Sequence, residues 1–430
     1  MSEKAIQKFV VLFKPDSGDD PQLKQAFSER GFTLICLEPS QWAALAELPR
    51  PPSALLIQPD FTSPWPDDII SKIRELFQDT HIPVLALLSS VHSFEDYDCD
   101  SVLLSPVHPM QIVIRTIGLV RLASMQQEIL LRLQTLEEDF SLHCDLPDPG
   151  PESPFRVLFV GKATPDFMVV INALQKRNVI VVAAFTSFTA FDYLYEQTFD
   201  AVVINGLGTL EPALSVTQAM RKNARLFNVP VMLLVNGDTF REQDTVFKAG
   251  MDDLLDAKSD ESVISSRVIE QANFHRLHKN LKEKMGGLGG DLVTDRQTGL
   301  YNKAFFNAHL ARIYAWNTAR DLPVTLCLIK VSAKEDSPSS DSIVASYPQI
   351  GELLKNMVRL QDITARIAPN VFAIAFPGQT VEQLKPVEER IAAILKCAVL
   401  SDPETGAPLH IKLDVRFTDL EETESNENVA

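Results

Sequence analysis

Arg359 and Asp362 lie three residues apart in the run Arg359-Leu360-Gln361-Asp362, and their side chains have complementary hydrogen-bonding chemistry. An arginine can donate a fork of hydrogen bonds to a phosphate oxygen or to O6 and N7 of guanine, and an aspartate can accept the N1 and N2 protons of guanine. The three-residue spacing lets both side chains project from one turn at a helix end. The pair is therefore a candidate site for a guanine nucleotide, although a solvated surface ion pair has the same pattern.

The overall charge and the histidine spacing argue against several other kinds of site. The 430 residues include 40 Lys+Arg against 57 Asp+Glu, a formal charge of -17, which disfavours binding to nucleic acid or anionic membranes through bulk electrostatics. No apolar run approaches the roughly 18 residues of a membrane span, so we expect a soluble protein that is not exported. His275 and His278 have no acidic or thiol companion at metal-ligand spacing, so we predict a solvated helix face there and no metal site.

The first two thirds of the chain contain two copies of one apolar pattern. Three runs recur at an offset of 147 residues, starting at Val10, Ala54 and Pro83 in the first copy and at Val157, Ala201 and Pro230 in the second. A fourth run, Val102-Leu103-Leu104, recurs as Leu254-Leu255 at an offset of 152. These runs alternate with segments of helical period, such as 68–77 and 215–227, which predicts buried parallel strands joined by crossover helices. Each copy is therefore predicted to be a small doubly wound α/β domain.

Segments rich in glycine and proline divide the chain. A helical segment over 121–140 is followed by DLPDPGPESP at 145–154, and another over 263–285 runs into GGLGG at 286–290, which has the composition of a hinge. Beyond it, helices, strands and a hairpin around 364–376 give an α+β order with a mostly antiparallel sheet. We place the domains at 1–144, 152–285 and 291–418, followed by a disordered acidic tail at 419–430.

Two motifs carry a family resemblance. The run FKAGMDDLL at 247–255 resembles the helix-to-strand passage of response-regulator receiver domains, whose fold is that of CheY and flavodoxin. The run DRQTGLYNK at 295–303 is similar to the opening D-x-x-T-G-L-Y-N-R of GGDEF domains, which have the nucleotide-cyclase-like fold of diguanylate cyclases. The chain thus resembles the PleD family, with two tandem receiver domains and a C-terminal GGDEF domain.

The resemblance implies that both receivers have lost their chemistry. A working receiver phosphorylates an aspartate at the end of its third strand, beside a Mg²⁺ held by an acidic pair. The phosphoacceptor position falls on Gln58 in the first copy and on Asn205 in the second, where Gly161-Lys162 also replaces the acidic pair. We expect two pseudo-receivers, and a shifted acceptor at Asp60 is the alternative for the first.

The third domain has the same pattern of lost carboxylates. Active cyclases hold two metal ions with an aspartate at the end of the first sheet strand and a carboxylate of the GG(D/E)EF hairpin. Here Lys330 and Ser332 stand at the strand positions. Both glycines and both acids of the hairpin are replaced, and its five positions read Ala368, Pro369, Asn370, Val371 and Phe372. We expect a protein that is not an enzyme, without catalytic residues, metal or cofactor.

The R-x-x-D pair has the register of the inhibitory site, or I-site, of GGDEF proteins, because Asp362 lies four residues before Arg366. In that family a further arginine in the following helix completes the pocket, and Arg390 is the matching residue. The resemblance therefore implies binding of cyclic di-GMP as a regulatory ligand through Arg359, Asp362 and Arg390. The alternatives are a scaffold that binds no nucleotide and an active diguanylate cyclase.

The resemblance to the non-enzymatic members of this family also implies partners. It implies a cytoplasmic adaptor, enriched at the cell pole, that helps to deliver cell-cycle regulators to the ClpXP protease through a proteolytic adaptor. Paired receivers further imply a homodimer, because the last helix and strand of a receiver commonly form an isologous face. We expect no nucleic acid partner and no membrane insertion.

Overall fold

The computed structural model describes residues 8–15, 18–59, 69–77, 80–89, 98–146, 153–237, 244–333, 344, 346–397, 400–401, 406 and 411–420. The chain divides into two compact units, which comprise residues 1–123 with 149–281, and residues 124–148 with 282–430. None of the helices in the described part of the chain has the length and apolar character that a membrane crossing requires.

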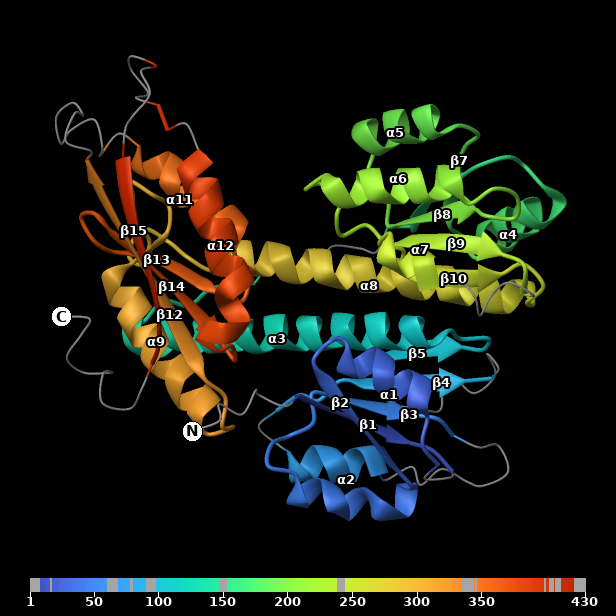
Figure 1. Cartoon of the computed structure of the whole chain (residues 1–430), viewed down its shortest axis with the longest axis horizontal. Coiled ribbons are helices and arrows are strands. Elements are labelled where there is room, and N and C mark those ends of the chain that lie inside the picture. The colour runs from blue at the N-terminus through green and yellow to red at the C-terminus, as the bar shows by residue number, and fades with distance from the viewer. Residues whose placement is uncertain are drawn as a thin grey trace. The chain divides into compact units, whose positions relative to one another are not determined.

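The first domain contains a sheet of five parallel strands in the order β2-β1-β3-β4-β5. The strands are β1 (Lys8–Phe13), β2 (Phe32–Leu37), β3 (Ala54–Ile57), β4 (Val84–Leu88) and β5 (Ser101–Leu104). Helix α1 (Pro21–Ser28) and the start of α3 (Pro109–Phe140) cover one face, while η1 (Pro39–Glu47) and α2 (Ile69–Leu76) cover the other (Figure 1). This strand order is that of doubly wound flavodoxin-like sheets.

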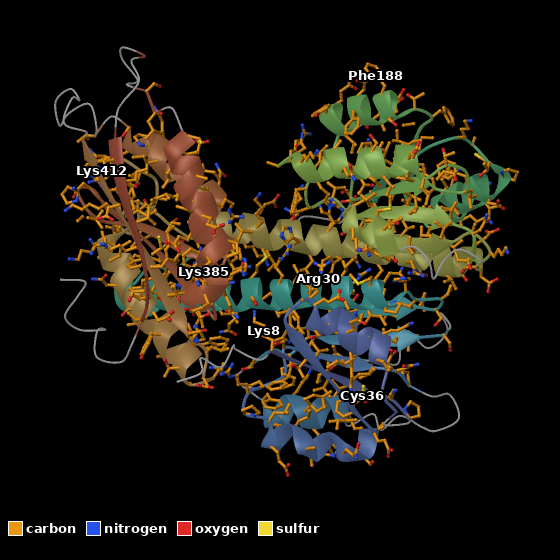
Figure 2. The ribbon with its side chains drawn as sticks, in the orientation of Figure 1. Lys8, Arg30, Cys36, Phe188, Lys385 and Lys412 are labelled. Atoms are coloured by element: carbon orange, nitrogen blue, oxygen red, sulfur yellow. The ribbon has the colours of Figure 1, made fainter. Side chains whose placement is uncertain are left out.

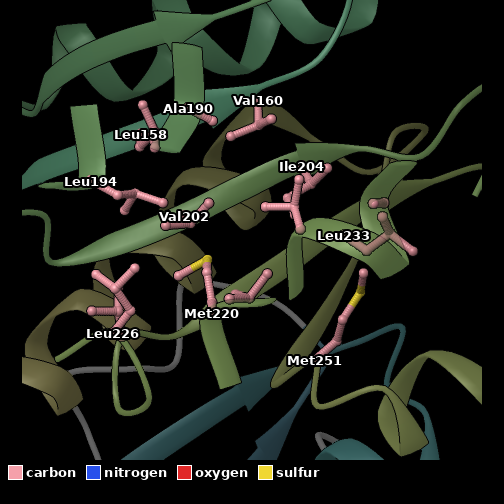
Figure 3. Close-up of a cluster of buried hydrophobic side chains, with 14 of the residues drawn as sticks. Leu158, Val160, Ala190, Leu194, Val202, Ile204, Met220, Leu226, Leu233 and Met251 are labelled. Atoms are coloured by element: carbon pink, nitrogen blue, oxygen red, sulfur yellow. The ribbon is translucent and has the colours of Figure 1, made fainter. Parts of the chain in front are cut away.

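The second domain has the same topology, with parallel strands in the order β10-β9-β8-β6-β7. Its strands are β6 (Arg156–Val160), β7 (Ile180–Ala184), β8 (Ala201–Asn205), β9 (Val231–Val235) and β10 (Asp253–Asp256). Its helices are α4 (Pro165–Lys176), α5 (Ser187–Glu196), α6 (Glu211–Lys222), α7 (Asp244–Lys248) and α8 (Glu261–Gly287). Figure 3 shows the buried cluster between the sheet and helices α5 and α6, which includes Val202, Ile204 and Met220. The prediction of parallel doubly wound α/β sheets is confirmed.

The second strand of each copy escaped the sequence pattern. Strands β2 and β7 lie at an edge of their sheets, and most of their residues are only half-buried. In β7, Ile180 at the start of the strand is exposed, and only Ala184 at its end is buried. An edge strand covered on one side does not need a continuous apolar run, so the apolar pattern predicts four strands per copy where the structure has five.

The third domain contains a five-stranded sheet in the order β11-β13-β14-β12-β15. Its strands are β11 (Tyr301–Asn302), β12 (Val324–Ala333), β13 (Ile363–Ala368), β14 (Val371–Pro377) and β15 (Ile411–Asp419). All pairs are antiparallel except β11 with β13, which confirms the expected mostly antiparallel sheet. Helices α11 (Tyr347–Met357) and α12 (Val381–Cys397) contribute to the core with β12 and β14, and α9 (Lys303–Thr318) packs on β13 and β14.

Three expected boundaries differ from the structure. The predicted linker helix over 121–140 is the second half of α3, which is continuous from Pro109 to Phe140. Helix α8 continues through Gly286 and Gly287, so the predicted hinge begins inside a helix. Strand β15 extends to Asp419, which accepts a hydrogen bond from Thr325 Oγ1 at 2.6 Å. Residues 421–430 of the predicted tail lie outside the described residues.

The two domains with parallel sheets, which make up the first unit, share a polar interface. Gln111 of α3 donates hydrogen bonds to the carboxylate of Asp253 and to the carbonyl oxygen of Leu254, the latter at 3.1 Å. Arg267 of α8 donates to the carbonyl oxygen of Pro106 at 2.8 Å and to Asp253 at 2.6 Å. These contacts join the last strand and helix of one domain to those of the other. The faces expected to form a homodimer therefore contact each other within one chain, and a homodimer would need further surface.

Candidate functional site

The R-x-x-D turn connects α11 to β13. Its ends are fixed by apolar anchors, since Leu354 and Met357 are buried before it and Ile363 is fully buried after it. Two hydrogen bonds close the turn. The Arg359 backbone N–H donates to Asp362 Oδ2 at 2.8 Å, and the Asp362 backbone N–H donates to the Arg359 carbonyl oxygen at 3.1 Å. The Arg359 side chain is exposed, whereas Asp362 is only 7% exposed, which differs from a solvated surface pair.

Arg390 lies beside this turn. It belongs to α12, and its Nη2 donates a hydrogen bond of 2.7 Å to the carbonyl oxygen of Met357, two residues before Arg359. The side chain of Arg390 is otherwise exposed, as is that of Arg359. The structure thus brings the three residues of the predicted ligand site to one corner of the third domain. Two exposed cations and a carboxyl group at one turn can bind a phosphate and the donor edge of a guanine base.

Burial changes the pKa of Asp362, the acid of the turn. Burial raises the pKa of Asp362 to about 7, against the opposing effects of the hydrogen bond from the Arg359 N–H and of the Arg359 guanidinium. Glu128 raises the pKa further, whereas Arg132 lowers it. Near neutral pH, the Asp362 carboxyl group therefore exists in both protonation states.

Glu128 and Arg132 of α3 were missed by the sequence reasoning. Both are almost completely buried in the second unit, at 4% and 5% exposed. Arg132 Nη2 donates to the carbonyl oxygen of Leu360 at 3.0 Å and, with a longer bond of 3.4 Å, to that of Asp362. In the sequence, these two residues appear only as a Glu/Arg pair at i,i+4 spacing on a helix, and such a pair ordinarily indicates a solvated helix face.

The D-x-x-T-G motif at residues 295–299 has a structural role. Asp295 Oδ1 accepts hydrogen bonds from the Thr298 backbone N–H at 2.9 Å and from its hydroxyl at 2.8 Å, which shapes the D-x-x-T-G loop. The same carboxylate forms an ion pair with Arg366 at 3.3 Å. A side chain at position 351 would meet the Thr298 carbonyl oxygen at 2.3 Å, so Gly351 of α11 allows this loop to approach.

The hairpin between β13 and β14 carries the replaced GGDEF positions. The guanidinium of Arg366 donates to the carbonyl oxygen of Pro369 at 2.8 Å, and the strand register shifts between Arg366 and Ala368. Asn370 Nδ2 donates to the carbonyl oxygen of Val331 at 3.1 Å. Val371 is paired with Lys330, and Phe372 is fully buried in the core. The turn is held by an arginine and an amide and presents no carboxylate of its own.

On β12, the two positions that carry aspartates in active cyclases are Lys330 and Ser332. Ser332 is paired with Lys412 of β15, which Figure 2 labels, and its hydroxyl donates to the Lys412 carbonyl oxygen at 3.4 Å. Within the described ranges, no group of three or more His, Cys, Asp or Glu residues is arranged to hold a metal ion. Burial lowers the pKa of His275 to about 4, and its Nδ1 has no hydrogen-bond partner within the described part of the chain. The half-buried His275 differs from the solvated histidine expected from the sequence.

The two phosphoacceptor positions are occupied by amides. Asn205, at the end of β8, donates from Nδ2 to the carbonyl oxygen of Lys162 at 2.8 Å and accepts the Leu207 backbone N–H at 3.0 Å. Gln58 follows β3, is exposed, and donates its backbone N–H to the Phe13 carbonyl oxygen. Asp60, the alternative acceptor, lies outside the described residues.

No family model matches the chain. The chain is 24% identical over 198 residues to the protein named "Response regulator PleD" of Caulobacter vibrioides, a match over 45% of this chain and 43% of that protein. The chain therefore spans less than half the length of this curated relative.

Solved structures with weak overall similarity include domains of both kinds. The GGDEF domain of DgcB from Caulobacter crescentus in complex with c-di-GMP matches 33% of this chain and 82% of its own, at 19% identity and a TM-score of 0.30. The FimX GGDEF domain from Pseudomonas aeruginosa matches 31% of this chain and 85% of its own, at 21% identity and a TM-score of 0.28. The response regulator CheY4 of Vibrio cholerae matches 28% of this chain and 99% of its own, at 16% identity and a TM-score of 0.26. The topology described above defines an α/β protein with receiver-like parallel sheets and a GGDEF-like domain.

Proposed function

We propose that this protein is a non-catalytic effector that binds cyclic di-GMP at the turn of Arg359 and Asp362, with Arg390 as a third contact. One observation carries the proposal: the hydrogen bond of 2.7 Å from Arg390 to the Met357 carbonyl oxygen holds a second exposed guanidinium beside the turn. Three polar groups from α12 and the α11–β13 connection meet there, although Arg359 and Arg390 are 31 positions apart in the sequence.

The chemistry of these groups suits a compact dianion with guanine bases. The two guanidinium groups supply fixed positive charge and forked donors for phosphate oxygens or for guanine O6 and N7. The Asp362 carboxylate supplies the acceptor for guanine N1 and N2 protons. Local cations of this kind act over a few ångströms, so they can bind an anion despite the net charge of -17.

The absence of catalysis is part of the proposal. It is supported by the residues at the hairpin and on β12, where Lys330, Ser332, Asn370 and Val371 supply no metal-binding carboxylate. Transfer of a nucleotidyl group from GTP needs carboxylates that position divalent metal ions. An active diguanylate cyclase is therefore disfavoured, and incubation with GTP and Mg²⁺ should yield no cyclic di-GMP. No cofactor is needed for the proposed role.

The proposed partners rest on resemblance alone. The similarity to a PleD response regulator supports a role in cyclic di-GMP signalling, and the lost carboxylates resemble those of PopA, a non-enzymatic relative. By this resemblance the protein is a cytoplasmic adaptor enriched at the cell pole, which helps to deliver cell-cycle regulators to ClpXP through a proteolytic adaptor. Its mechanism would be differential affinity, with the ligand favouring the domain arrangement that partners bind. A homodimer is part of the same proposal.

The test is calorimetric titration of the full chain with cyclic di-GMP. We expect a dissociation constant of about 1 μM or lower for the wild type and loss of binding for Arg359→Ala. Arg416→Ala is the matched control, because Arg416 is an exposed arginine of β15, paired with Asp414, and lies outside the proposed site. Absence of heat with the wild type would favour the scaffold that binds no nucleotide. Equal binding by Arg359→Ala would remove the turn from the proposal.

A further inference from the structure

The second half of α3 carries a buried polar cluster that contacts the third domain. Glu128 Oε1 accepts a hydrogen bond from Arg132 Nε at 2.6 Å and lies 3.0 Å from His309 Nε2 of α9. Thr135 Oγ1 lies 2.8 Å from His309 Nδ1. Glu128, Arg132, Thr135 and His309 are each no more than 5% exposed. Charges at this depth are tolerated only when they are paired and hydrogen-bonded, which fixes their geometry.

Arg132 extends this cluster to the candidate ligand site. Its Nη2 donates to the carbonyl oxygens of Leu360 and Asp362, which are two of the four residues of the R-x-x-D turn. Its guanidinium also lies 5.6 Å from the ring of Tyr301, in the D-x-x-T-G-L-Y-N motif. The backbone of the turn is therefore held by a side chain from a helix that begins in the first parallel domain, at Pro109.

The same cluster acts on the charge of Asp362. Glu128 disfavours the carboxylate form of Asp362, and Arg132 favours it. Arg132 also pairs with Glu128 and thereby compensates the charge of that neighbour. Burial alone would raise the pKa of Glu128, but Arg132 and His309 hold it below its usual value, so Glu128 remains charged. Loss of Arg132 would leave His309 to compensate the charge of Glu128 beside Asp362, and it would release two of the turn's carbonyl oxygens.

We propose that Arg132 is a positioning residue of the cyclic di-GMP site, and that ligand occupancy is thereby coupled to the attachment of helix α3 to the third domain. This inference rests on the proposed function, and it assigns to that site a regulatory connection. Because coupling is reciprocal, a contact that strengthens ligand binding is itself strengthened by the ligand to the same degree. Helix α3 is covalently continuous with the first domain, so it links the ligand site to that domain.

The test compares cyclic di-GMP affinity and ligand-induced hydrogen exchange in the full chain. We expect Arg132→Ala to weaken binding at least tenfold, and Arg132→Lys, which keeps the charge but not the fork, to give an intermediate value. Arg312→Ala is the matched control. Arg312 of α9 forms ion pairs with Glu138 and Asp139 of α3 at 2.7 and 3.1 Å, so its loss removes contacts with α3 that do not involve the turn, and affinity should change less than twofold.

Hydrogen exchange tests the coupling in the wild type itself. In the wild type, cyclic di-GMP should slow exchange in residues 124–140, and this slowing should be lost in Arg132→Ala. Wild-type binding with no change in exchange over 124–140, or unchanged affinity in both Arg132 variants, would overturn the coupling and leave the proposed function intact. Absence of binding by the wild type would instead overturn the proposed function, and the coupling with it. If Arg132→Ala fails to fold, the affinity of Arg132→Lys and the wild-type exchange data still test the coupling.

Discussion

The backbone N–H of Arg359 donates a hydrogen bond of 2.8 Å to Oδ2 of Asp362, so one oxygen of the buried acid closes the turn to which both residues belong. In the proposed complex, the guanine contact would then fall to the other oxygen, Oδ1. Because the carboxyl group is buried, its protonation state is sensitive to neighbouring charges, which are Arg359 in the turn and Glu128 and Arg132 from α3. Turn geometry and ligand chemistry thus depend on the same side chain.

Affinity for cyclic di-GMP should increase with pH. The pKa of Asp362 is about 7 in the folded protein, and only the carboxylate can accept both guanine protons. The fraction of protein that is competent to bind therefore rises as pH rises from 6 to 8, and proton release should accompany binding near pH 6. Calorimetry in buffers of different ionisation enthalpy measures both effects. Asp362→Asn should bind weakly and without this pH dependence, and a wild-type affinity that is constant over this range would contradict the assignment.

Asp362→Asn should also stabilise the free protein at alkaline pH. The folded-state pKa of Asp362 is about 7, above the usual value of 3.8, so between these values the folded state holds a proton that the unfolded state has released. Folding stability contributed by this group therefore falls as pH rises from about 4 to 7. The asparagine oxygen still accepts the Arg359 N–H but carries no ionisation cost. We expect a gain of about 1–3 kcal/mol at pH 8 and little difference at pH 4, measured by urea unfolding.

Glu128→Ala should destabilise the second unit strongly, by about 3–5 kcal/mol, because it leaves the charge of Arg132 buried without its partner and removes a hydrogen-bond partner of His309. Glu138→Ala is the control on the same helix. Glu138 is 61% exposed and pairs with Arg312, so its loss should cost less than about 1 kcal/mol. Urea unfolding followed by fluorescence compares the two variants. Similar losses would show that the Glu128 cluster does not hold α3 in place.

Restoring the acceptor alone should not restore receiver chemistry. In Asn205→Asp the new carboxylate would face the Lys162 carbonyl oxygen, with no acidic pair to hold Mg²⁺. A side chain cannot easily be added at Gly161, where φ is +127° and a Cβ would lie 2.9 Å from Asn205 Cβ. We expect no phosphorylation of wild type or Asn205→Asp by acetyl phosphate and Mg²⁺, as measured by intact mass. A base-labile phosphorylated form of either would contradict the pseudo-receiver interpretation.

The sequence predicted those parts of the structure that depend on local pattern. The buried strands beginning near Val10, Ala54 and Val84 appear as continuous apolar runs, and their repetition at a fixed offset identified a duplicated sheet. The edge strands β2 and β7 were missed because half-exposed strands lack that run. Motif register also located the R-x-x-D turn between a helix and a strand, where the structure has it.

The local sequence pattern did not predict the long-range polar contacts. Glu128 and His309 are 181 positions apart, and nothing in the local sequence of either indicates a buried pair. The spacing of Arg359 and Asp362 indicated a turn but not that Asp362 is buried, and that burial changes its pKa. The Arg366 contact with Pro369 likewise depends on how a turn without glycine is closed. Such contacts are set by packing between elements rather than by the period within one element.

A crystal structure of the full chain with cyclic di-GMP tests the central claim most directly. We predict the dinucleotide at the corner formed by the α11–β13 turn and α12, with guanidinium contacts from Arg359 and Arg390 and a guanine edge on the Asp362 carboxylate. Arg132 should retain its hydrogen bonds to the carbonyl oxygens of Leu360 and Asp362. A dinucleotide bound elsewhere, or crystals at saturating ligand that leave this turn without it, would contradict the account.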